Sequence, residues 1–297
     1  MRSDIIKTIE NLFKKAADAP KALVSVAAAG DLHVLESCVE AHNKGLAGFI
    51  LVGCQAKIQE IAQEAGLDIT PFHIVDEPDH LLACQKAVSL VSTGQATALM
   101  KGIVDTSTIM RAALDKETGM RTGRKLSHLA AFEVANYHKL LFITDAAINI
   151  APNATDKCEI VHNAVEALNS LGIPKPKVAL LAAKETVDEK MTATTDCPTI
   201  IAKGWPTALV DGPLALDNAI SKEACEIKGI TSPVGGDADL LVAPNIEAGN
   251  VLYKSLAFLA NARCGGVVVG AKRPIILTSR ADSADAKLIA IALSVLF

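Results

Sequence analysis

Short runs of Val, Ile, Leu and Ala alternate with longer segments in which apolar residues recur every three or four positions. The short runs predict buried strands, and the longer segments, several of which end at a glycine, predict helices. Such alternation is typical of α/β units around a largely parallel sheet. In the first half of the chain the expected strands are 22–29, 48–53, 72–76 and 96–102.

A second series of the same kind follows the basic segment 120–128. Its expected strands lie within 139–146, 173–183, 208–212, 239–244 and 266–279. The stretch around Thr192, Thr194 and Thr195 is polar and predicts no element of its own. We therefore expect a two-domain α/β fold. Residues 1–124 plus 268–297 would form the first domain and residues 125–267 the second, with a ligand cleft between them.

Composition limits the kinds of molecule that the protein is expected to bind. The chain has 297 residues, a formal net charge of −4 and no dense Lys/Arg block, so we expect no nucleic-acid surface. The start of the chain is amphipathic, unlike a signal peptide, and no run reaches the roughly 20 apolar residues that span a membrane. The seven cysteines are scattered without metal-ligand spacing. A cytoplasmic protein with free thiols is expected, and an anionic ligand would be held by local geometry.

Three strand-to-helix junctions carry candidate binding residues, because ligands of open α/β sheets bind beyond the carboxyl ends of strands. In the first, 100–111, Thr106, Ser107 and Thr108 stand at a helix start and Arg111 about one turn further on. Hydroxyls and an arginine can hold a phosphate by charge-assisted hydrogen bonds. The alternative is that one hydroxyl caps the helix and Arg111 is a solvated surface residue.

The second junction, 232–254, surrounds an expected strand. Gly235 and Gly236 precede the strand, and the candidate substrate-binding residues Asn245, Gly249, Asn250 and Lys254 follow it. Asparagine side chains and glycine allow a polar ligand to approach the backbone closely. The alternative is a long loop that uses turn residues for its turns.

The third junction, 276–287, places Arg280 where a strand hands over to the last helix. A cation at a helix N-terminus costs roughly 0.3–1 kcal/mol unless negative charge offsets it. Asp282 and Asp285 could supply that charge, with Ser279 or Asp282 as N-cap. A bound anion could supply it too. Ser279 as an acylated nucleophile has little support, because GxSxG is absent.

Other ligand classes find little support. No GxGxxG follows a strand, and GxxxxGK[ST] does not occur. Asp211, Asp217, Asp237 and Asp239 flank strands and helix starts without a metal-ligand spacing, which favours structural roles.

Taken in this order, the junctions resemble the phosphate acetyltransferase/phosphate butyryltransferase family. Segment 232–254 followed by PIILTSRADS is similar to the family pattern SPV-x-G … P-(D/N)-x-x-x-GN-x-x-YK … P-x-x-x-x-SR, and 142–168 resembles its central strand–loop–helix segment. The resemblance covers nearly the whole chain, and the LTSRADS wording looks closer to the butyryl branch. It implies an isocitrate/isopropylmalate dehydrogenase-like two-domain fold with the active site between the domains, and a homo-oligomer, at least a dimer.

The resemblance also implies the chemistry. A short-chain acyl group, butyryl or similar, would pass reversibly between acyl-CoA and inorganic phosphate to give acyl phosphate and CoA, with acetyl-CoA as the alternative substrate. CoA would be a substrate, and no metal or other cofactor is expected. By the family's motifs Arg111 and Arg280 would bind the phosphoryl group, Ser279 would hydrogen-bond at the reacting centre, and Thr106 and Ser107 would contact phosphate.

One position departs from the family pattern. The acetyl branch has a catalytic aspartate seven residues after the serine of the Ser-Arg pair, where this chain has Ala286. Asp285 is one residue earlier, which on a helix turns the side chain by about 100°. The candidate bases are therefore Asp285, Asp282 or another group. Two other classes stay open, a metal-dependent decarboxylating dehydrogenase of the same fold and a non-catalytic acyl-CoA sensor.

Overall fold

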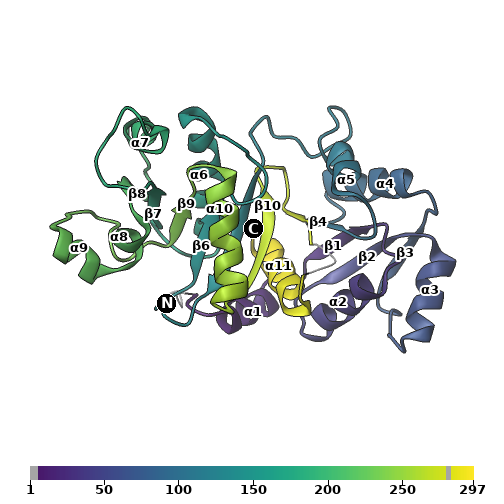
Figure 1. The fold of residues 1–297 in the computed structure, drawn as a ribbon. Helices are drawn as coiled ribbons and strands as arrows, with labels where there is room; N and C mark the ends of the chain where they lie inside the picture. The colour runs from purple at the N-terminus through teal and green to yellow at the C-terminus, as the bar shows by residue number, and fades with distance from the viewer. Residues whose placement is uncertain (1–5, 279–281) are drawn as a thin grey trace. The chain divides into compact units, whose positions relative to one another are not determined.

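The computed structural model describes residues 6–278 and 282–297, and Figure 1 traces its fold. Two of the candidate catalytic residues, Ser279 and Arg280, lie outside the described residues. The chain forms two compact units, here called the terminal unit (Glu10–Arg124 with Gly265–Phe297) and the central unit (Lys125–Cys264 with residues 6–9). The sequence-based division differs from these limits at residues 6–9, which join the central unit, and at 265–267, which join the terminal unit.

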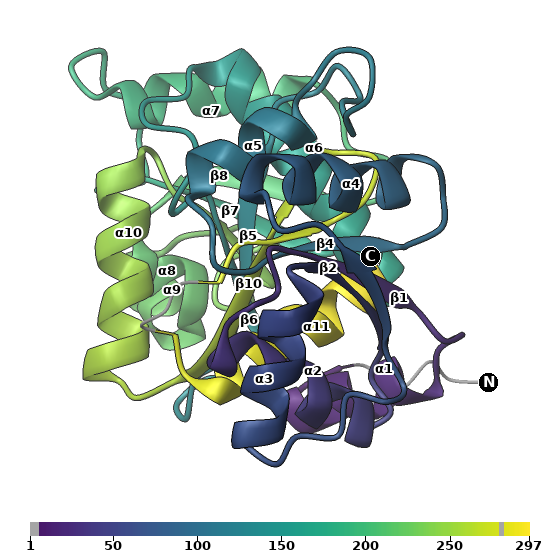
Figure 2. The ribbon, with the colours of Figure 1, turned by 90° about the vertical axis from the view of Figure 1, so that its right-hand side faces the viewer.

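The terminal unit is built on a sheet of strand order β3-β2-β1-β4-β11-β10. Its strands are β1 (Leu23–Ala27), β2 (Gly48–Gly53), β3 (His73–Asp76), β4 (Ala98–Lys101), β10 (Arg263–Val269) and β11 (Ile275–Ile276). All described pairs are parallel except β10 with β11. Its helices are α1 (Ile9–Asp18), α2 (Leu32–Asn43), α3 (Gln55–Glu64), α4 (His80–Ser92), α5 (Thr106–Ala113) and α11 (Ala284–Leu296). Figure 2 shows α4 and α5 on one face of the strands and α2 and α11 on the other.

The central unit has the strand order β5-β6-β9-β7-β8. Its strands are β5 (Ser127–Glu133), β6 (Leu141–Thr144), β7 (Lys177–Leu181), β8 (Leu209–Leu214) and β9 (Leu240–Val242). Only β5 runs antiparallel to its described neighbour. Its helices are α6 (Ala154–Ser170), α7 (Thr192–Ala202), α8 (Leu216–Ile220), α9 (Lys222–Lys228) and α10 (Ile246–Lys254), which continues into the π-helical turn η1 (Ser255–Leu259). The α/β class with largely parallel strands is confirmed.

Local sequence chemistry explains where several helices begin. Asn153 and Asp156 form a reciprocal capping box at α6, in which each side chain accepts a hydrogen bond from the other residue's backbone amide. Asp31 caps α2 by accepting a hydrogen bond from the Val34 amide. Both caps follow a strand of the parallel sheet, so each helix N-terminus points to the carboxyl edge where ligands are expected.

Two expected helix starts were wrong. The N-cap of α5 is Asp105 rather than Thr106, Ser107 or Thr108. The N-cap of α11 is Ser283, whose Oγ accepts a hydrogen bond from the Ala286 amide at 3.1 Å, rather than Ser279 or Asp282. In both cases a residue with an extended backbone stands directly before the first helical residue, and neighbouring cap-forming residue types hid it.

Other elements were missed or overextended. The threonine-rich stretch after Met191 is helix α7, with Thr194 buried, and residues 127–133 form strand β5. The helix-like sequence pattern that starts at Thr106 extends to Gly119, but helix α5 ends at Ala113. The Asp115 carboxylate accepts the amides of Glu117 and Thr118 and turns the chain. Within residues 6–278 and 282–297, no helix combines the length and apolar character needed to cross a bilayer.

Candidate functional site

The candidate residues lie in both units, and the hydroxyl–arginine group belongs to the terminal unit. Thr106 and Ser107 begin α5, Arg111 stands on its next turn, and all three are exposed. The Asp105 side chain makes no capping hydrogen bond, so it leaves the first amides of α5 uncovered. None of the side chains of Thr106, Ser107 and Arg111 has a hydrogen-bond or ion-pair partner in the described part of the chain. The group has the chemistry to bind an anion, and neither hydroxyl is engaged in capping.

The loop that presents this group is fixed by close packing at Gly102. A Cβ at Gly102 would lie 2.2 Å from the Ala28 carbonyl oxygen, so only glycine lets the end of β4 approach the end of β1 this closely. The amides of Gly102 and Ile103 donate to the carbonyls of Ala27 and Ala28, both at 2.8 Å. The start of α5 is thereby tied to the carboxyl edge of the sheet.

Asp285 stands in the first turn of α11 and is half-buried. The neighbouring Ala286, where the acetyl branch has its aspartate, contributes its amide to the Ser283 cap. Asp282 is half-buried just before this turn. With Ser279 and Arg280 outside the described residues, the choice of base among these carboxylates stays a prediction.

The central unit contains a pocket of about 860 Å³ at the carboxyl edge of its sheet. It opens beyond β7 and β9, where the starts of α6, α7, α8 and α10 converge. Its lining is mostly alanine, leucine, proline and methionine, with Asn153, Lys157, Lys190, Thr192 and Asn245 as polar members. An apolar pocket with a few convergent polar groups is the usual form of a small-molecule site.

Of the second-junction candidates, the structure places Asn245 in this pocket and gives the others different contacts. Asn245 caps α10, since its Oδ1 accepts the Ala248 amide at 2.9 Å, and it lines the pocket as well. Gly249 is buried, and an added Cβ would lie 2.4 Å from the Asp145 carbonyl oxygen. Asn250 Nδ2 donates to the Ala146 carbonyl at 3.2 Å. Gly249 and Asn250 thus hold α10 against the loop after β6, while Lys254 is exposed.

That loop is organised by Asp145, which sequence reasoning missed. Its buried carboxylate accepts the amides of Ala147 and Ile148, at 2.8 and 2.9 Å, and the Asn149 side chain at 2.7 Å. An aspartate directly after an apolar strand is the sequence signal that could have identified it. Asp145 shapes the surface on which Gly249 packs and so positions α10 beside the pocket.

A buried ion pair in the pocket wall was also missed. Lys157 Nζ on α6 lies 2.6 Å from Asp196 Oδ2 on α7, and the two side chains are 6% and 12% exposed. A buried pair of this kind needs both partners, because each charge alone would be left without solvation. It fixes α6 against α7 at the pocket, and the two residues are too far apart in sequence to pair by pattern.

The SPVGG segment leads to the opposite, amino-terminal edge of the central sheet, where β9 begins. Ser232 Oγ donates to Asp211 Oδ2 at 2.5 Å and accepts the amides of Val234 and Gly235. A Cβ on Gly236 would meet the Lys222 backbone at 2.6 Å, so this glycine allows close packing on α9. These contacts are structural and are separate from the pocket at the carboxyl edge.

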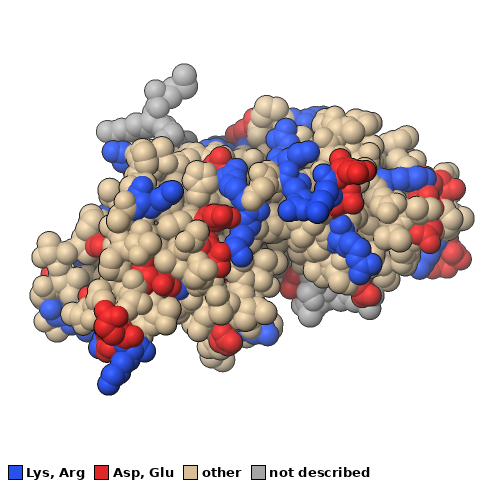
Figure 3. All heavy atoms as spheres, turned by 90° about the horizontal axis from the view of Figure 1, so that it is seen from above, with Lys and Arg blue, Asp and Glu red and all other residues tan. Residues whose placement is uncertain are grey.

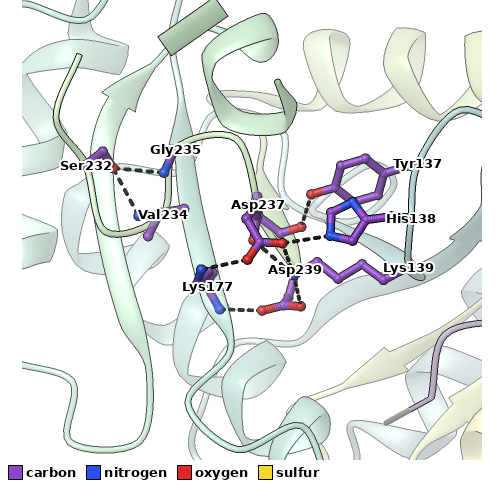
Figure 4. A network of polar contacts seen from close by, with 10 residues as sticks. Tyr137, His138, Lys139, Lys177, Ser232, Val234, Gly235, Asp237 and Asp239 are labelled. Carbon is purple, nitrogen blue, oxygen red and sulfur yellow. Dashed lines mark hydrogen bonds and ion pairs between the residues drawn. The ribbon is translucent and has the colours of Figure 1, made fainter. Parts of the chain in front are cut away.

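Asp237 and Asp239 occupy the same amino-terminal edge, where Figure 4 shows their ion pairs. Asp237 accepts hydrogen bonds from Lys177 Nζ at 2.6 Å and Lys139 Nζ at 3.0 Å, and lies 2.8 Å from His138 Nε2. Partial burial by itself would raise the pKa of Asp237, but the lysines hold this pKa well below its ordinary value. The structural reading of the four aspartates is confirmed, since Asp211 accepts from Ser232 and Asp217 pairs with Lys228.

Charge on the surface is mixed in sign. On the face seen in Figure 3, lysine and arginine side chains alternate with aspartate and glutamate and form no wide field of one sign. Among the described residues no group of three or more His, Cys, Asp or Glu side chains has a metal-binding arrangement. Anion binding would therefore rest on particular side chains and helix ends.

Comparison with known proteins shows that one family model covers both the hydroxyl–arginine group and the central-unit pocket. The family model described as phosphate acetyl/butaryl transferase matches residues 79–295, which include α5, the pocket and α11. The chain belongs to this family. A phosphate butyryltransferase of Clostridium acetobutylicum is 44% identical over 98% of both chains. A phosphate acetyltransferase of Rhizobium meliloti is 43% identical over 95% of this chain and 90% of its own.

A solved structure agrees with the family assignment. The branched-chain phosphotransacylase from Enterococcus faecalis V583 superposes with a TM-score of 0.84 at 36% identity, covering 93% of this chain and 98% of its own. The resemblance seen in the sequence is confirmed. Both branch names occur among the relatives, so family membership does not by itself select the acyl group.

Proposed function

We propose that this chain is an acyltransferase that moves a short-chain acyl group, butyryl or similar, reversibly between CoA and inorganic phosphate. Family membership carries this proposal, with the near-full-length likeness to a phosphate butyryltransferase as its main support. Acetyl transfer is the second candidate, supported by the 43% identity with a phosphate acetyltransferase.

The phosphoryl group would bind at the terminal unit. The unengaged hydroxyls of Thr106 and Ser107 and the Arg111 guanidinium support this placement, because an arginine and helix-start groups together suit phosphate oxygens. Arg280 and Ser279, from the third junction, would complete the set by the family's motif.

The acyl-CoA would use the central-unit pocket. Its apolar walls suit the acyl chain and pantetheine arm, and Asn245 or Lys190 at its lining could bond polar groups along that arm. Lys254 would act on the anionic part of CoA, as an exposed cation on α10. Gly249 and Asn250 would contribute indirectly, through the position of α10.

The proposed reaction is a direct displacement in a ternary complex. From acyl phosphate, a carboxylate, with Asp285 as first candidate, takes the proton of the CoA thiol, and the sulfur attacks the acyl carbonyl. The carbon–oxygen bond to phosphate then breaks and phosphate leaves. Arg111 and Arg280 offset the negative charge on the phosphate and on the tetrahedral intermediate, and holding both substrates together lowers the entropic cost. No electrons are transferred, so the step needs no redox cofactor, and we propose no metal.

We extend the proposal to architecture and assembly. The two units would correspond to the domains of an isocitrate/isopropylmalate dehydrogenase-like fold with the reaction between them. The chain would form at least a dimer. Val251, Phe258 and Leu259, which are 65%, 77% and 85% exposed on α10 and η1, support a self-contact, and light scattering of the purified chain would test it.

The decisive experiment is a phosphate-dependent panel of acyl-CoA substrates, acetyl through octanoyl and branched C4–C5, in which released CoA thiol is measured. We expect release that requires phosphate and is fastest with a four-carbon acyl group. A maximum at acetyl-CoA would select the second candidate, and absence of phosphate-dependent release from every substrate would refute phosphate acyltransfer.

Arg111 offers a residue-level test of the same proposal. Arg111→Ala should raise the KM for phosphate at least tenfold and lower kcat, because it removes the guanidinium that would bind the phosphate oxygens at the start of α5. Arg273→Ala removes an exposed arginine just before the amino end of β11, at the opposite edge of the terminal sheet, and should leave both constants unchanged. Equal kinetics of the two variants would remove Arg111 from the site.

A further inference from the structure

A small cavity in the terminal unit lies at the carboxyl ends of the sheet strands, close to the start of α5. Its volume is about 20 Å³, and it opens to solvent, so a ligand larger than a water molecule would sit at its mouth. Lys101, the last residue of β4, lines it together with Asp31 after β1, Thr278 after β11 and Lys287 on α11. Both Thr278 and Lys287 lie within the third junction, 276–287, but the sequence motifs gave neither of them a role.

Lys287 is a buried cation without a counterion. It lies one turn after the Ser283 cap of α11 and is only 6% exposed. Its ammonium group has no hydrogen-bond or ion-pair partner among the residues that the structure describes. Its ammonium nitrogen is not fully shielded from solvent, and an anion at the cavity would supply the missing counterion.

Thr278 presents a second unsatisfied group to the same cavity. It is 9% exposed, and in the described part of the chain its hydroxyl has no partner either. The hydroxyl is not fully shielded from solvent, so it is available to a ligand at the cavity. A cation and a hydroxyl that both lack partners in one cavity fit an oxyanion with several acceptor oxygens.

The other charged residues of the cavity leave it net positive. Lys101 Nζ donates to the carbonyls of Gly102 and Val104, at 3.2 and 3.3 Å, and so fixes the loop that leads into α5. Asp31 is the carboxylate of the lining. Its Oδ1 accepts the Val34 amide as the cap of α2, and it lies beyond 4.0 Å from Lys287 Nζ. His33 is exposed and faces Glu36.

We propose that Lys287 and Thr278 bind the phosphoryl oxygens of inorganic phosphate and acyl phosphate. This inference rests on the proposed function, and it adds two residues to the phosphate site on the same edge as Thr106 and Ser107. Lys287 supplies charge rather than a proton. In the acyl-phosphate direction it stabilises the phosphate that leaves, and in the reverse direction it holds the phosphate whose oxygen attacks the thioester.

The test combines binding and kinetics on the full chain. Thermal unfolding is followed at increasing inorganic phosphate for the wild type, Lys287→Met and Lys287→Arg. Lys86→Met is the control, because Lys86 forms a surface pair with Glu77 in the same unit. The wild type and the control should be stabilised by phosphate. For Lys287→Met, the phosphate concentration that gives half of the stabilisation should be at least tenfold higher than for the wild type. For Lys287→Arg, this concentration should rise less.

Steady-state constants separate a binding role from a structural one. Lys287→Met should raise the KM for phosphate at least tenfold and change the KM for acyl-CoA less than twofold. Without phosphate it should unfold close to the wild-type temperature, because the ammonium of Lys287 makes no hydrogen bond or ion pair with the described residues that the substitution would break. A variant that is less stable yet keeps the wild-type response to phosphate would overturn the inference.

Further arms keep the inference distinct from the proposed function. Thr278→Val, which has the same shape, should weaken phosphate binding three- to tenfold and serves if Lys287→Met does not fold. Adenosine 3′,5′-bisphosphate, a probe for the phosphates of CoA, should bind the wild type and Lys287→Met alike, and a loss in the variant would contradict the assignment to the transferred phosphate. Lys287-dependent phosphate binding in a wild type that releases no CoA would refute the proposed function alone.

Discussion

Asp237→Asn tests how much the ion pairs at the amino-terminal edge stabilise the central unit. The carboxylate accepts from Lys177 at 2.6 Å and Lys139 at 3.0 Å, and its side chain is 22% exposed. Asparagine keeps the shape and loses the charge. Lys139 keeps its 2.6 Å pair with Asp239, whereas the ammonium of Lys177 loses its carboxylate partner.

The expected loss follows from this partial burial. Breaking a fully buried pair costs 3–5 kcal/mol, and an exposed pair contributes roughly 0.2–1 kcal/mol. Asp237 lies between these limits, and one of its two lysines stays paired. We therefore expect Asp237→Asn to lower the free energy of unfolding of the central unit by about 2 kcal/mol at pH 7.

The pH dependence gives the prediction its sharpest form. Because the lysines hold the pKa of Asp237 below its ordinary value, its contribution is complete above the unfolded-state pKa of about 3.9 and is lost as the pH falls through the lower folded-state pKa. The difference between wild type and Asp237→Asn should be constant from pH 7 to about 5 and shrink below about pH 4.

Urea unfolding followed by tryptophan fluorescence measures this difference. The single tryptophan, Trp205, lies in the central unit and donates to the Ile200 carbonyl, so the signal reports on this unit. Asp217→Asn, in an exposed pair with Lys228, is the control and should change little. The reasoning is refuted if Asp237→Asn loses nothing at pH 7, or loses as much at pH 3.5 as at pH 7.

Two further changes probe α10. Gly249→Ala would place a Cβ 2.4 Å from the Asp145 carbonyl oxygen, so α10 must shift. We expect a loss of about 1–3 kcal/mol in Trp205-monitored unfolding, and a stability equal to that of the exposed control Val251→Ala would contradict it. Asn245→Ala removes the helix cap and should cost about 1 kcal/mol. Asn245→Asp should restore that stability, because aspartate also caps a helix, and should still raise the KM for acyl-CoA, because it adds a charge to the pocket. If both variants were equally destabilised, the capping role of Asn245 would be ruled out.

The strands were predictable because buried parallel strands are short aliphatic runs, and β2 has the limits expected from its sequence. The misses have local causes. Strand β5 begins inside the basic segment 120–128, which has the composition of a connector. Helix α7 is rich in threonine and contains Pro198, which both lower helix propensity. Helix starts were misplaced where several capping residue types stand in a row, as at 105–108.

The positions of the candidate residues in the fold were predictable as far as they depend on the order of strands along the chain. Thr106, Ser107, Arg111 and Asn245 all follow strands and were recognised for that reason. By the same rule Gly235 and Gly236, which precede β9, belong to the opposite edge, as the structure has them.

Contacts between distant residues could not be read from the sequence. The Lys157–Asp196 pair and the packing of Gly249 on Asp145 depend on which helices become neighbours. The burial of Lys287 likewise depends on which elements pack together. In the sequence it is an ordinary polar residue before the apolar run of α11, and only the packing of this helix in the terminal unit buries it.

The division of the terminal unit between two stretches of chain has a consequence for biosynthesis. Strand β11 lies between β4 and β10 in the sheet and pairs directly with β4, so residues 10–124 cannot complete their sheet until residues 265–297 have been made. At about 5–20 residues per second, the ribosome needs roughly 7–28 s for the intervening central unit. During this time β4 lacks its neighbour β11, and the C-terminal segment that places Lys287 in the same cavity as Lys101 has not yet been made. Most of the terminal unit is therefore made before the central unit, yet the terminal unit is the last to finish folding, and its open edge is where a chaperone would be needed.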